Sequence, residues 1–318
     1  MKTKLTTSVV LAATAIACGA SAAPAAAVSV PTFGIGDQKP TMFNDPLFRD
    51  LGVRRTRIFV PWNVALVPGE RARFETWLTE ARGAGTEPLV AFNHSREAQC
   101  PRKNCRVPSV KQYKRAFLAF KRKFGRKVRV VSPWNEANHQ TQPTGKNPKR
   151  AAEFYNIVQR YCRGCRIVAL DLLDSGNQRR YLRTFMRYAK KKPRYIGLHN
   201  YSDVNRRRTS GLKRLISEIK RDKRLRRTQI WLTETGGIVR FETDSGKVPF
   251  RFSPARAASR TNYLFKVARE YRRNVRRVYL YQWNIDTSGN RFDAGLIDEN
   301  GRKRPAYDVV KRYRKYFR

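Results

Sequence analysis

Two glutamates stand at the ends of short apolar runs, each next to a polar neighbour. Glu136 follows Asn135, and Glu234 follows Thr233. Two carboxyl groups that face each other can divide acid and base work between them, because their surroundings can keep one protonated and the other ionised. Hydrolysis of a glycosidic bond needs such a pair, with an acid for the leaving oxygen and a carboxylate opposite. We therefore predict Glu136 and Glu234 as the catalytic residues.

Amides, imidazoles and indoles stand at the ends of the other apolar runs. Aromatic faces stack on sugar rings, and amides bind sugar hydroxyls, so this composition suits a carbohydrate ligand. No ligand spacing joins the three histidines, so we expect no catalytic metal and no cofactor. No nucleophile-elbow motif supports an esterase. The predicted substrate-binding residues are Arg57, His94, Trp134, Asn135, His199, Tyr201 and Trp283.

These residues also have simpler structural interpretations. Either glutamate could form an ion pair with one of the many arginines, and Arg57 could merely pair with Asp37 or another acid. The histidines could be hydrogen-bonded residues of the fold. The presence of Asn135 beside one glutamate, and of a second glutamate three runs later, favours the catalytic interpretation.

Eight strand-like runs alternate with amphipathic segments. The helical segments show apolar residues at i, i+3, i+4 and i+7, as in Phe74, Trp77, Leu78 and Ala81. Eight βα units predict an α/β protein, a single-domain (β/α)8 TIM barrel, whose active site lies at the carboxyl ends of the strands. A doubly wound sheet is the alternative, but no Gly-x-Gly-x-x-Gly follows the first run. The runs are 33–36, 57–61, 88–92, 128–133, 167–172, 195–199, 230–233 and 278–283.

The first 27 residues are typical of a secretory signal peptide. Lys2 and Lys4 precede an apolar run at 5–17, and small residues follow at 20–22 and 25–27. We expect a secreted or cell-surface protein whose catalytic domain spans 28–318. A lipoprotein anchored at Cys18 is the alternative, but the leucine expected three residues before a lipidated cysteine is missing. No later segment is long and apolar enough to span a membrane.

Four cysteines follow the leader, and an even number in an exported chain predicts disulfides. The expected pairs are Cys100–Cys105 and Cys162–Cys165. A zinc site with four cysteine ligands is the alternative.

The net charge of +44 concerns partners rather than fold. The segment 110–124 alone carries six cations and no acid. These cations either face water on an outer ring of helices or attach the protein to an anionic cell-wall polymer. No nucleic-acid-binding motif accompanies it, so we expect no specific nucleic-acid partner, and we expect a monomer.

The segment Trp134-Asn135-Glu136-Ala137-Asn138 resembles the Asn-Glu signature of clan A, the retaining barrel glycosidases that include family 5 cellulases and family 39 xylosidases. The resemblance implies an acid/base at Glu136 on strand four and a nucleophile at Glu234 on strand seven, with Arg57 supporting the nucleophile. Ala137 departs from the proline that often follows the acid/base in that clan. The residues that match the clan's central sugar subsite are His94, Asn135, His199, Tyr201 and Trp283.

These observations predict a retaining glycosidase that acts on β-linked polysaccharides or oligosaccharides. We expect Arg57 and Tyr201 to keep Glu234 ionised, and we expect the pKa of Glu136 to be raised. Retention requires carboxyl groups about 5–5.5 Å apart. A non-catalytic carbohydrate- or wall-binding barrel is the rival hypothesis, and a nucleic-acid binder rests on charge alone. The loops 93–107, 139–147 and 240–252 would set specificity.

Overall fold

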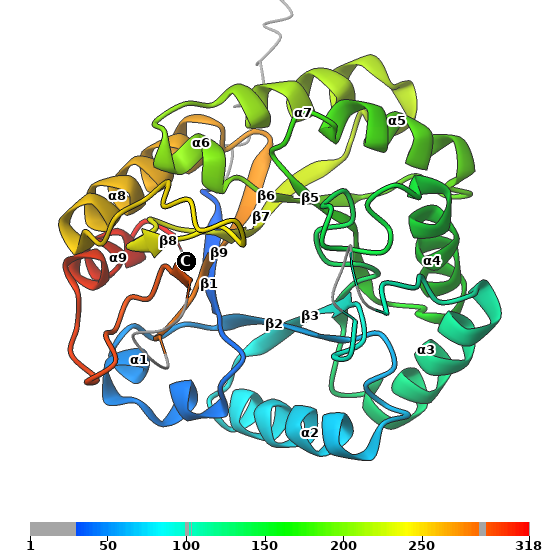
Figure 1. The fold of residues 1–318 in the computed structure, drawn as a ribbon, viewed down its shortest axis with the longest axis horizontal. Helices are drawn as coiled ribbons and strands as arrows, with labels where there is room; N and C mark the ends of the chain where they lie inside the picture. Colours follow the sequence, from blue (N-terminus) through cyan, green and yellow to red (C-terminus); the bar gives the residue numbers. More distant parts are fainter. Residues whose placement is uncertain (1–29, 99–101, 103, 286–290, 318) are drawn as a thin grey trace, which may run out of the picture.

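A computed structural model describes residues 30–98, 102, 104–285 and 291–317. The signal peptide predicted at 1–27 lies outside the described residues. Eight parallel strands form a closed barrel in sequence order, and the last pairs with the first (Figure 1). This confirms the single-domain (β/α)8 barrel and rules out the open sheet. The strands are β1 (Thr32–Gly36), β2 (Arg55–Pro61), β3 (Glu87–Asn93), β4 (Val130–Ser132), β5 (Arg166–Leu173), β6 (Tyr195–His199), β7 (Gln229–Thr235) and β9 (Val275–Tyr281).

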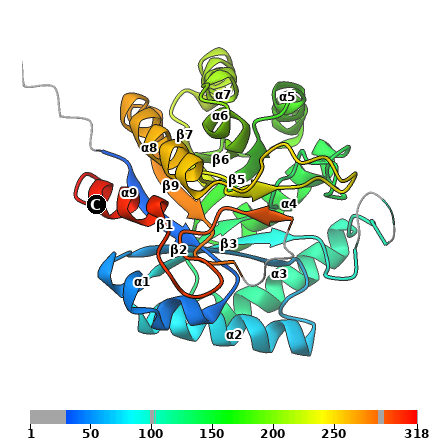
Figure 2. The ribbon, with the colours of Figure 1, turned by 60° about the vertical axis from the view of Figure 1, so that its left-hand side comes forward.

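Helices surround the barrel and bury their apolar stripes against it. In α2 the predicted stripe Phe74, Trp77, Leu78 and Ala81 is buried. Figure 2 shows the strands between α2 and α3 on one side and α5, α7 and α8 on the other. The helices are α1 (Pro46–Asp50), α2 (Pro68–Gly83), α3 (Val110–Phe124), α4 (Pro148–Tyr161), α5 (Gln178–Tyr188), α6 (Tyr201–Asn205), α7 (Ser210–Arg221), α8 (Pro254–Glu270) and α9 (Pro305–Arg314), with 3-10 turns at Pro40–Asn44 and Lys223–Leu225.

Three helices begin where a capping residue precedes a proline. Asp45, Asn147 and Ser253 each accept a hydrogen bond from a backbone N–H in the first turn of the helix that follows. Proline at the first helical position loses no hydrogen bond, because that N–H has no partner within the helix. Each of these three helices therefore begins at its proline.

The barrel interior is packed at its amino-terminal end by side chains from five strands. These side chains are Leu89, Val130, Val168, Trp231 and Tyr279. A second and larger core lies between the strands and the helices. Because the barrel interior is filled at its amino-terminal end, a ligand can enter only at the opposite end, where the strands finish.

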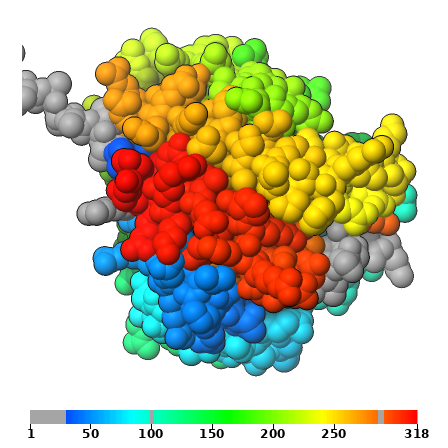
Figure 3. All heavy atoms as spheres, turned by 90° about the vertical axis from the view of Figure 1, so that its left-hand side faces the viewer, coloured from blue at the N-terminus to red at the C-terminus, as the bar shows by residue number. Residues whose placement is uncertain are grey.

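The C-terminal helix closes the ring of helices. α9 packs on α8 and lies beside the first strand–helix segment (Figure 3). The Tyr307 hydroxyl donates to Asp50 over 2.8 Å, and Lys311 pairs with the same carboxylate at 2.7 Å. A short antiparallel sheet joins β8 (Arg240–Phe241) to β10 (Phe292–Asp293). No described helix is long and apolar enough to cross a membrane.

The structure contains the predicted disulfide Cys162–Cys165, which links the end of α4 to the start of β5, with Cα atoms 5.5 Å apart. Cys105 is also disulfide-bonded. Cys100, its expected partner, lies outside the described residues. Since oxidised cysteines cannot ligate zinc, the four-cysteine zinc site is wrong.

Candidate active site

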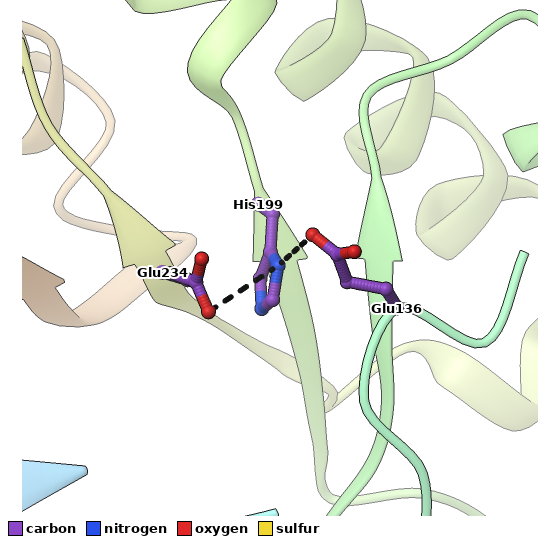
Figure 4. Close-up of side chains that lie close together, drawn as sticks. All are labelled: Glu136, His199 and Glu234. Carbon is purple, nitrogen blue, oxygen red and sulfur yellow. Dashed lines mark hydrogen bonds and ion pairs between the residues drawn. The ribbon is translucent and has the colours of Figure 1, made fainter. Parts of the chain in front are cut away.

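The two predicted catalytic glutamates come from β4 and β7. Glu234 lies near the end of β7 and is 7 % exposed. Glu136 follows β4, and its φ of 46° turns the chain out of the strand conformation. Figure 4 shows the two side chains on either side of His199. A carboxylate oxygen of Glu136, a carboxylate oxygen of Glu234 and a ring nitrogen of His199 all lie within 4.8 Å of one another. The two carboxyl groups therefore face each other across a short gap.

Arg57 on β2 connects the residues beneath this gap. Its guanidinium is 1 % exposed and donates to Glu234 over 2.6 Å and to Asn135 over 2.5 Å. It also pairs with Asp171 of β5 at 3.1 Å. The two carboxylates raise the pKa of Arg57 against the effect of burial, so the cation is permanent. Arg57 therefore pairs with a catalytic candidate and also with another acid, Asp171. Asp37 is not among its ion-pair partners in the described part of the chain.

His199 at the end of β6 lies between Arg57 and Glu136. Its Nε2 is 3.3 Å from a guanidinium nitrogen, and its Nδ1 is 3.1 Å from a Glu136 oxygen. A guanidinium can only donate, so Nε2 must accept and the ring proton must be on Nδ1. His199 thus donates its proton to Glu136, which favours the ionised carboxylate.

The pKa of Glu136 differs from the expectation. Burial acts to raise it, but the hydrogen bond from His199 and the electrostatic attraction of His199, His139 and Arg57 for the carboxylate outweigh burial. The pKa of Glu136 therefore lies below its usual value, and the raised pKa predicted from the sequence is wrong for the free protein. The physical reason is that the sequence does not show how many donors and cations converge on one carboxylate.

Tyr201 supplies the second hydrogen bond to Glu234. Its hydroxyl lies 3.2 Å from Oε1 of that glutamate and 3.4 Å from the backbone oxygen of Tyr281. Burial and the charge of Glu234 raise the pKa of Tyr201 well above its usual value. The hydroxyl therefore stays protonated and donates, so Glu234 receives one hydrogen bond from Tyr201 and one from Arg57.

Asp171 is the residue that sequence reasoning left without a role. It is fully buried, pairs with Arg57 and accepts a 2.8 Å hydrogen bond from Thr233 on β7. A carboxylate that stays buried needs such partners. Its position at a strand end in an apolar run was a usable signal, but its partners come from two other strands.

The structure does not bring every predicted substrate-binding residue to the glutamates. Trp134 is fully buried, stacks on Phe154 of α4 at 5.1 Å, and donates its indole hydrogen to Gln142. Trp283 is 1 % exposed and donates to Asp45. Both rings are covered by protein, so neither offers a face to a sugar.

His94 lies at the mouth but on a separate cavity of about 240 Å³, which it lines together with Gln38, Asn93 and Arg96. Its Nδ1 lies 2.7 Å from the backbone oxygen of Ser95. Within the described parts of the chain, no hydrogen bond or ion pair links His94 to either glutamate. Asn135, His199 and Tyr201, in contrast, contact the glutamates or Arg57 directly.

Glu136, His199 and Glu234 also have the spacing of a possible metal site. The cation of Arg57 already lies 2.6 Å from Glu234 and takes the hydrogen-bonding capacity of His199 Nε2. A second cation would be repelled there. This arrangement favours proton transfer and nucleophilic chemistry at the three residues.

Comparison with known proteins agrees with this arrangement. Residues 91–309 match the glycosyl hydrolase catalytic core family. No curated protein sequence matches the chain.

Solved structures with the same fold include three glycosidases. An endo-1,4-β-xylanase from Caldicellulosiruptor owensensis superimposes with a TM-score of 0.61 at 14% identity, covering 89% of this chain and 96% of the xylanase. A family 5 enzyme from Bifidobacterium longum, in complex with Manβ1-4GlcNAc, gives 0.64 at 12% identity, covering 90% and 78%. An α-L-arabinofuranosidase from Thermotoga maritima gives 0.59 at 13% identity, covering 83% and 61%.

At these identities the structures show a shared fold, while the family match covers more than half of the chain. The resemblance to barrel glycosidases seen in the sequence is confirmed. The chain belongs to the glycosyl hydrolase catalytic core family, and it is a glycosidase.

Proposed function

We propose that this protein is a secreted retaining glycosidase for β-linked glycans, with Glu234 as nucleophile and Glu136 as acid/base. The observation that carries the proposal is the gap between the two carboxyl groups, whose oxygens approach within 4.8 Å. Retaining enzymes hold the pair about 5–5.5 Å apart, whereas inverting enzymes leave about 6.5–9.5 Å for a water molecule. The short gap therefore favours direct attack by a carboxylate.

In the first step Glu234 attacks the anomeric carbon and forms a glycosyl ester. The glycosidic bond breaks, and the proton of Glu136 passes to the leaving oxygen. Arg57 and Tyr201 fix the orientation of Glu234 through hydrogen bonds of 2.6 and 3.2 Å. Two fixed donors leave the attacking carboxylate little rotational freedom, which lowers the entropic part of the barrier.

In the second step Glu136 removes a proton from water, and the resulting hydroxide attacks the anomeric carbon. The ester bond breaks and Glu234 regains its charge. The hydrogen bond from His199 favours the ionised form of Glu136, which is the form that acts as base. The lowered pKa of Glu136 therefore suits this step, and the acid step requires a lower pH or a change on substrate binding.

Similar structures and the first residues of the chain support the substrate class and the location. The family 10 and family 5 structures that share the fold include enzymes named for β-1,4 linkages or solved with a β-1,4 disaccharide. The signal-like residues 1–27 support secretion. The rival, a non-catalytic carbohydrate binder, predicts a glutamate locked to a surface arginine, whereas the arginine that pairs with Glu234 is the buried Arg57.

Two glutamine variants test the assignment. Glu234→Gln should lose activity on natural and activated substrates alike, by at least about 1000-fold in kcat, or about 4 kcal/mol in the barrier. Glu136→Gln should still react slowly with an aryl glycoside that carries a good leaving group, and added azide should then release a glycosyl azide. Glu75→Gln, at a half-buried glutamate on α2 that pairs with Lys123, is the matched control and should act like the parent.

The screen should cover β-glucan, mannan, xylan, galactan and uronic-acid polymers, with product configuration followed by NMR. Retained configuration and azide rescue limited to Glu136→Gln support the proposal. Parental rates in both variants would show that the carboxylates are wrongly assigned. Glycan binding without cleavage of any polymer would favour the non-catalytic hypothesis.

A further inference from the structure

A groove between α3 and α4 on the outer surface carries positive charge that the protein does not neutralise. The groove encloses about 690 Å³, and the two helices lie side by side in the outer ring (Figure 1). Five exposed cations line it, and Glu153 is its one acidic residue. Glu153 is already paired with Arg150 at 2.7 Å. The lining cations are Lys114, Arg160, Arg163, Lys190 and Lys191.

None of these five cations has an ion-pair partner within the described ranges of the chain. The neighbouring surface of α5 and α7 differs, because Glu218 there accepts ion pairs from Arg179, Arg183 and Arg221. Like charges held close together repel one another unless an anion lies between them. The α3/α4 groove is therefore suited to an external anion, whereas much of the arginine charge around Glu218 is already neutralised within the protein.

The cations of the groove are held on a rigid frame. The Asn156 side chain binds the backbone oxygen of Tyr188 and the backbone N–H of Lys190, at 3.0 and 2.9 Å. These two hydrogen bonds hold the loop that carries Lys190 and Lys191 against α4. Arg163 lies in the short loop that the Cys162–Cys165 disulfide closes. A binding surface fixed in advance loses less entropy when it binds a ligand.

The charge continues beyond the groove. Lys114 also lines a second hollow of about 530 Å³ on the outer surface of α3, together with Lys111, Arg115 and Arg122, and no acid lines this hollow. A single small anion would contact one end of such a path. A linear polymer with regularly spaced negative charges can contact all of it.

The aromatic side chain in the groove argues against single-stranded nucleic acid. Lys114 and Arg160 both lie against the ring of Tyr161, at 5.3 and 5.4 Å from its centre. Nucleic-acid strands without sequence preference are held by bases stacked on open aromatic faces. Here the ring orients two cations, and arginine and lysine bind carboxylates without base contacts.

We propose that the α3/α4 groove binds a linear anionic polysaccharide, at a place separate from the barrel mouth. A polysaccharide is favoured over other polyanions because the chain belongs to a glycosidase family. The proposal does not depend on the roles of Glu136 and Glu234. Binding there would hold the protein on a carboxylated wall polymer while the mouth reaches glycan nearby.

The test measures binding of polygalacturonate to the full protein and to two triple variants. The groove variant is Lys114→Glu, Arg160→Glu and Lys191→Glu. The matched control is Lys213→Glu, Lys220→Glu and Lys223→Glu on exposed positions at α7 and the turn after it, which changes the net charge equally. We expect the groove variant to lose about tenfold or more in affinity and part of its salt dependence, and the control to lose less than about threefold.

Further arms identify the ligand. Fully methyl-esterified polygalacturonate should not bind, because its carboxylates are neutral. The two triple variants should lose affinity for duplex DNA equally, because that affinity would come from positive charge spread over the whole surface. Thermal unfolding and hydrolysis of a small aryl glycoside should match the parent in the groove variant, which separates this proposal from the proposed function.

Three results would overturn the proposal. One is equal loss of polygalacturonate binding in the two triple variants, which would mean that the charge acts diffusely. Another is unchanged binding of the methyl ester. The third is a loss of DNA binding confined to the groove variant, which would mean that the groove takes any polyanion.

Discussion

Replacing Arg57 with glutamine should lower both the stability of the barrel and its activity. The guanidinium is 1 % exposed and pairs with Asp171, which is fully buried, and with Glu234. Arg57→Gln leaves both carboxylates without their counter-charge. Removing one partner of a buried ion pair costs about 3–5 kcal/mol, because the remaining charge is not solvated. We expect a loss of that size in the free energy of unfolding.

A second substitution shows whether the buried charge is the cause. Asp171→Asn added to Arg57→Gln removes the unpaired charge and keeps an oxygen for the hydroxyl of Thr233. The double variant should regain roughly half of that loss, because the charge of Asp171 is gone while Glu234 still lacks its counter-charge. It should not regain activity, because Glu234 still lacks the donor that lies 2.6 Å away in the parent.

The assay is urea unfolding followed by tryptophan fluorescence, with kcat/KM measured on the folded protein. Arg304→Gln is the matched control, because Arg304 pairs with Asp293 at 2.7 Å and both are at most 5 % exposed. It should lose similar stability and keep its kcat/KM. If Arg57→Gln is as stable as the parent, or if Asp171→Asn gives no recovery, the reasoning from buried charge is refuted.

Three further predictions concern pH and the disulfide. His199→Leu removes the hydrogen bond to the Glu136 carboxylate, so the pKa of Glu136 should rise and the basic limb of kcat/KM should move up by about one pH unit; an unmoved limb would contradict this. Burial raises the pKa of Asp174 to about 6, so folding stability should fall as pH rises from about 4 to 6, and Asp174→Asn should abolish that slope in urea titrations and recover up to about 3 kcal/mol at pH 7. Replacing Cys162 and Cys165 with serine opens a loop of three-residue separation, so the unfolding free energy should drop by only about 2 kcal/mol and kcat/KM should persist; a larger loss would mean that the disulfide does more than close a loop.

Much of the barrel could be predicted because its strands are buried on both faces and so form continuous apolar runs. The run at 195–199 coincides with β6, and most others are one to three residues shorter than the strands. β4 is the exception, since the predicted 128–133 shrinks to Val130–Ser132. Pro133 has no backbone N–H and cannot extend the ladder.

The site was harder to predict because strand ends do not show where side chains point. Trp134 and Asn135 both follow the end of β4 at Ser132, so strand alternation does not fix where they point. Asn135 points to Arg57, and Trp134 faces α4 and stacks on Phe154 instead of lining the mouth. The turn at Glu136, with its positive φ, was not visible in the sequence. Such a turn depends on contacts from other strands.

The two catalytic candidates are linked through one imidazole and one guanidinium. Arg57 holds Glu234 and also donates to Nε2 of His199, which places the ring proton on Nδ1, where it points to Glu136. The hydrogen bond that orients the nucleophile thus comes from the same group that biases the acid/base toward its ionised form. When Glu234 is esterified, its negative charge is lost, and the field of Arg57 on Glu136 is less compensated. The charges therefore favour the base form of Glu136 most strongly in the step that needs a base, and we expect protonation of Glu136 to limit the first step as pH rises.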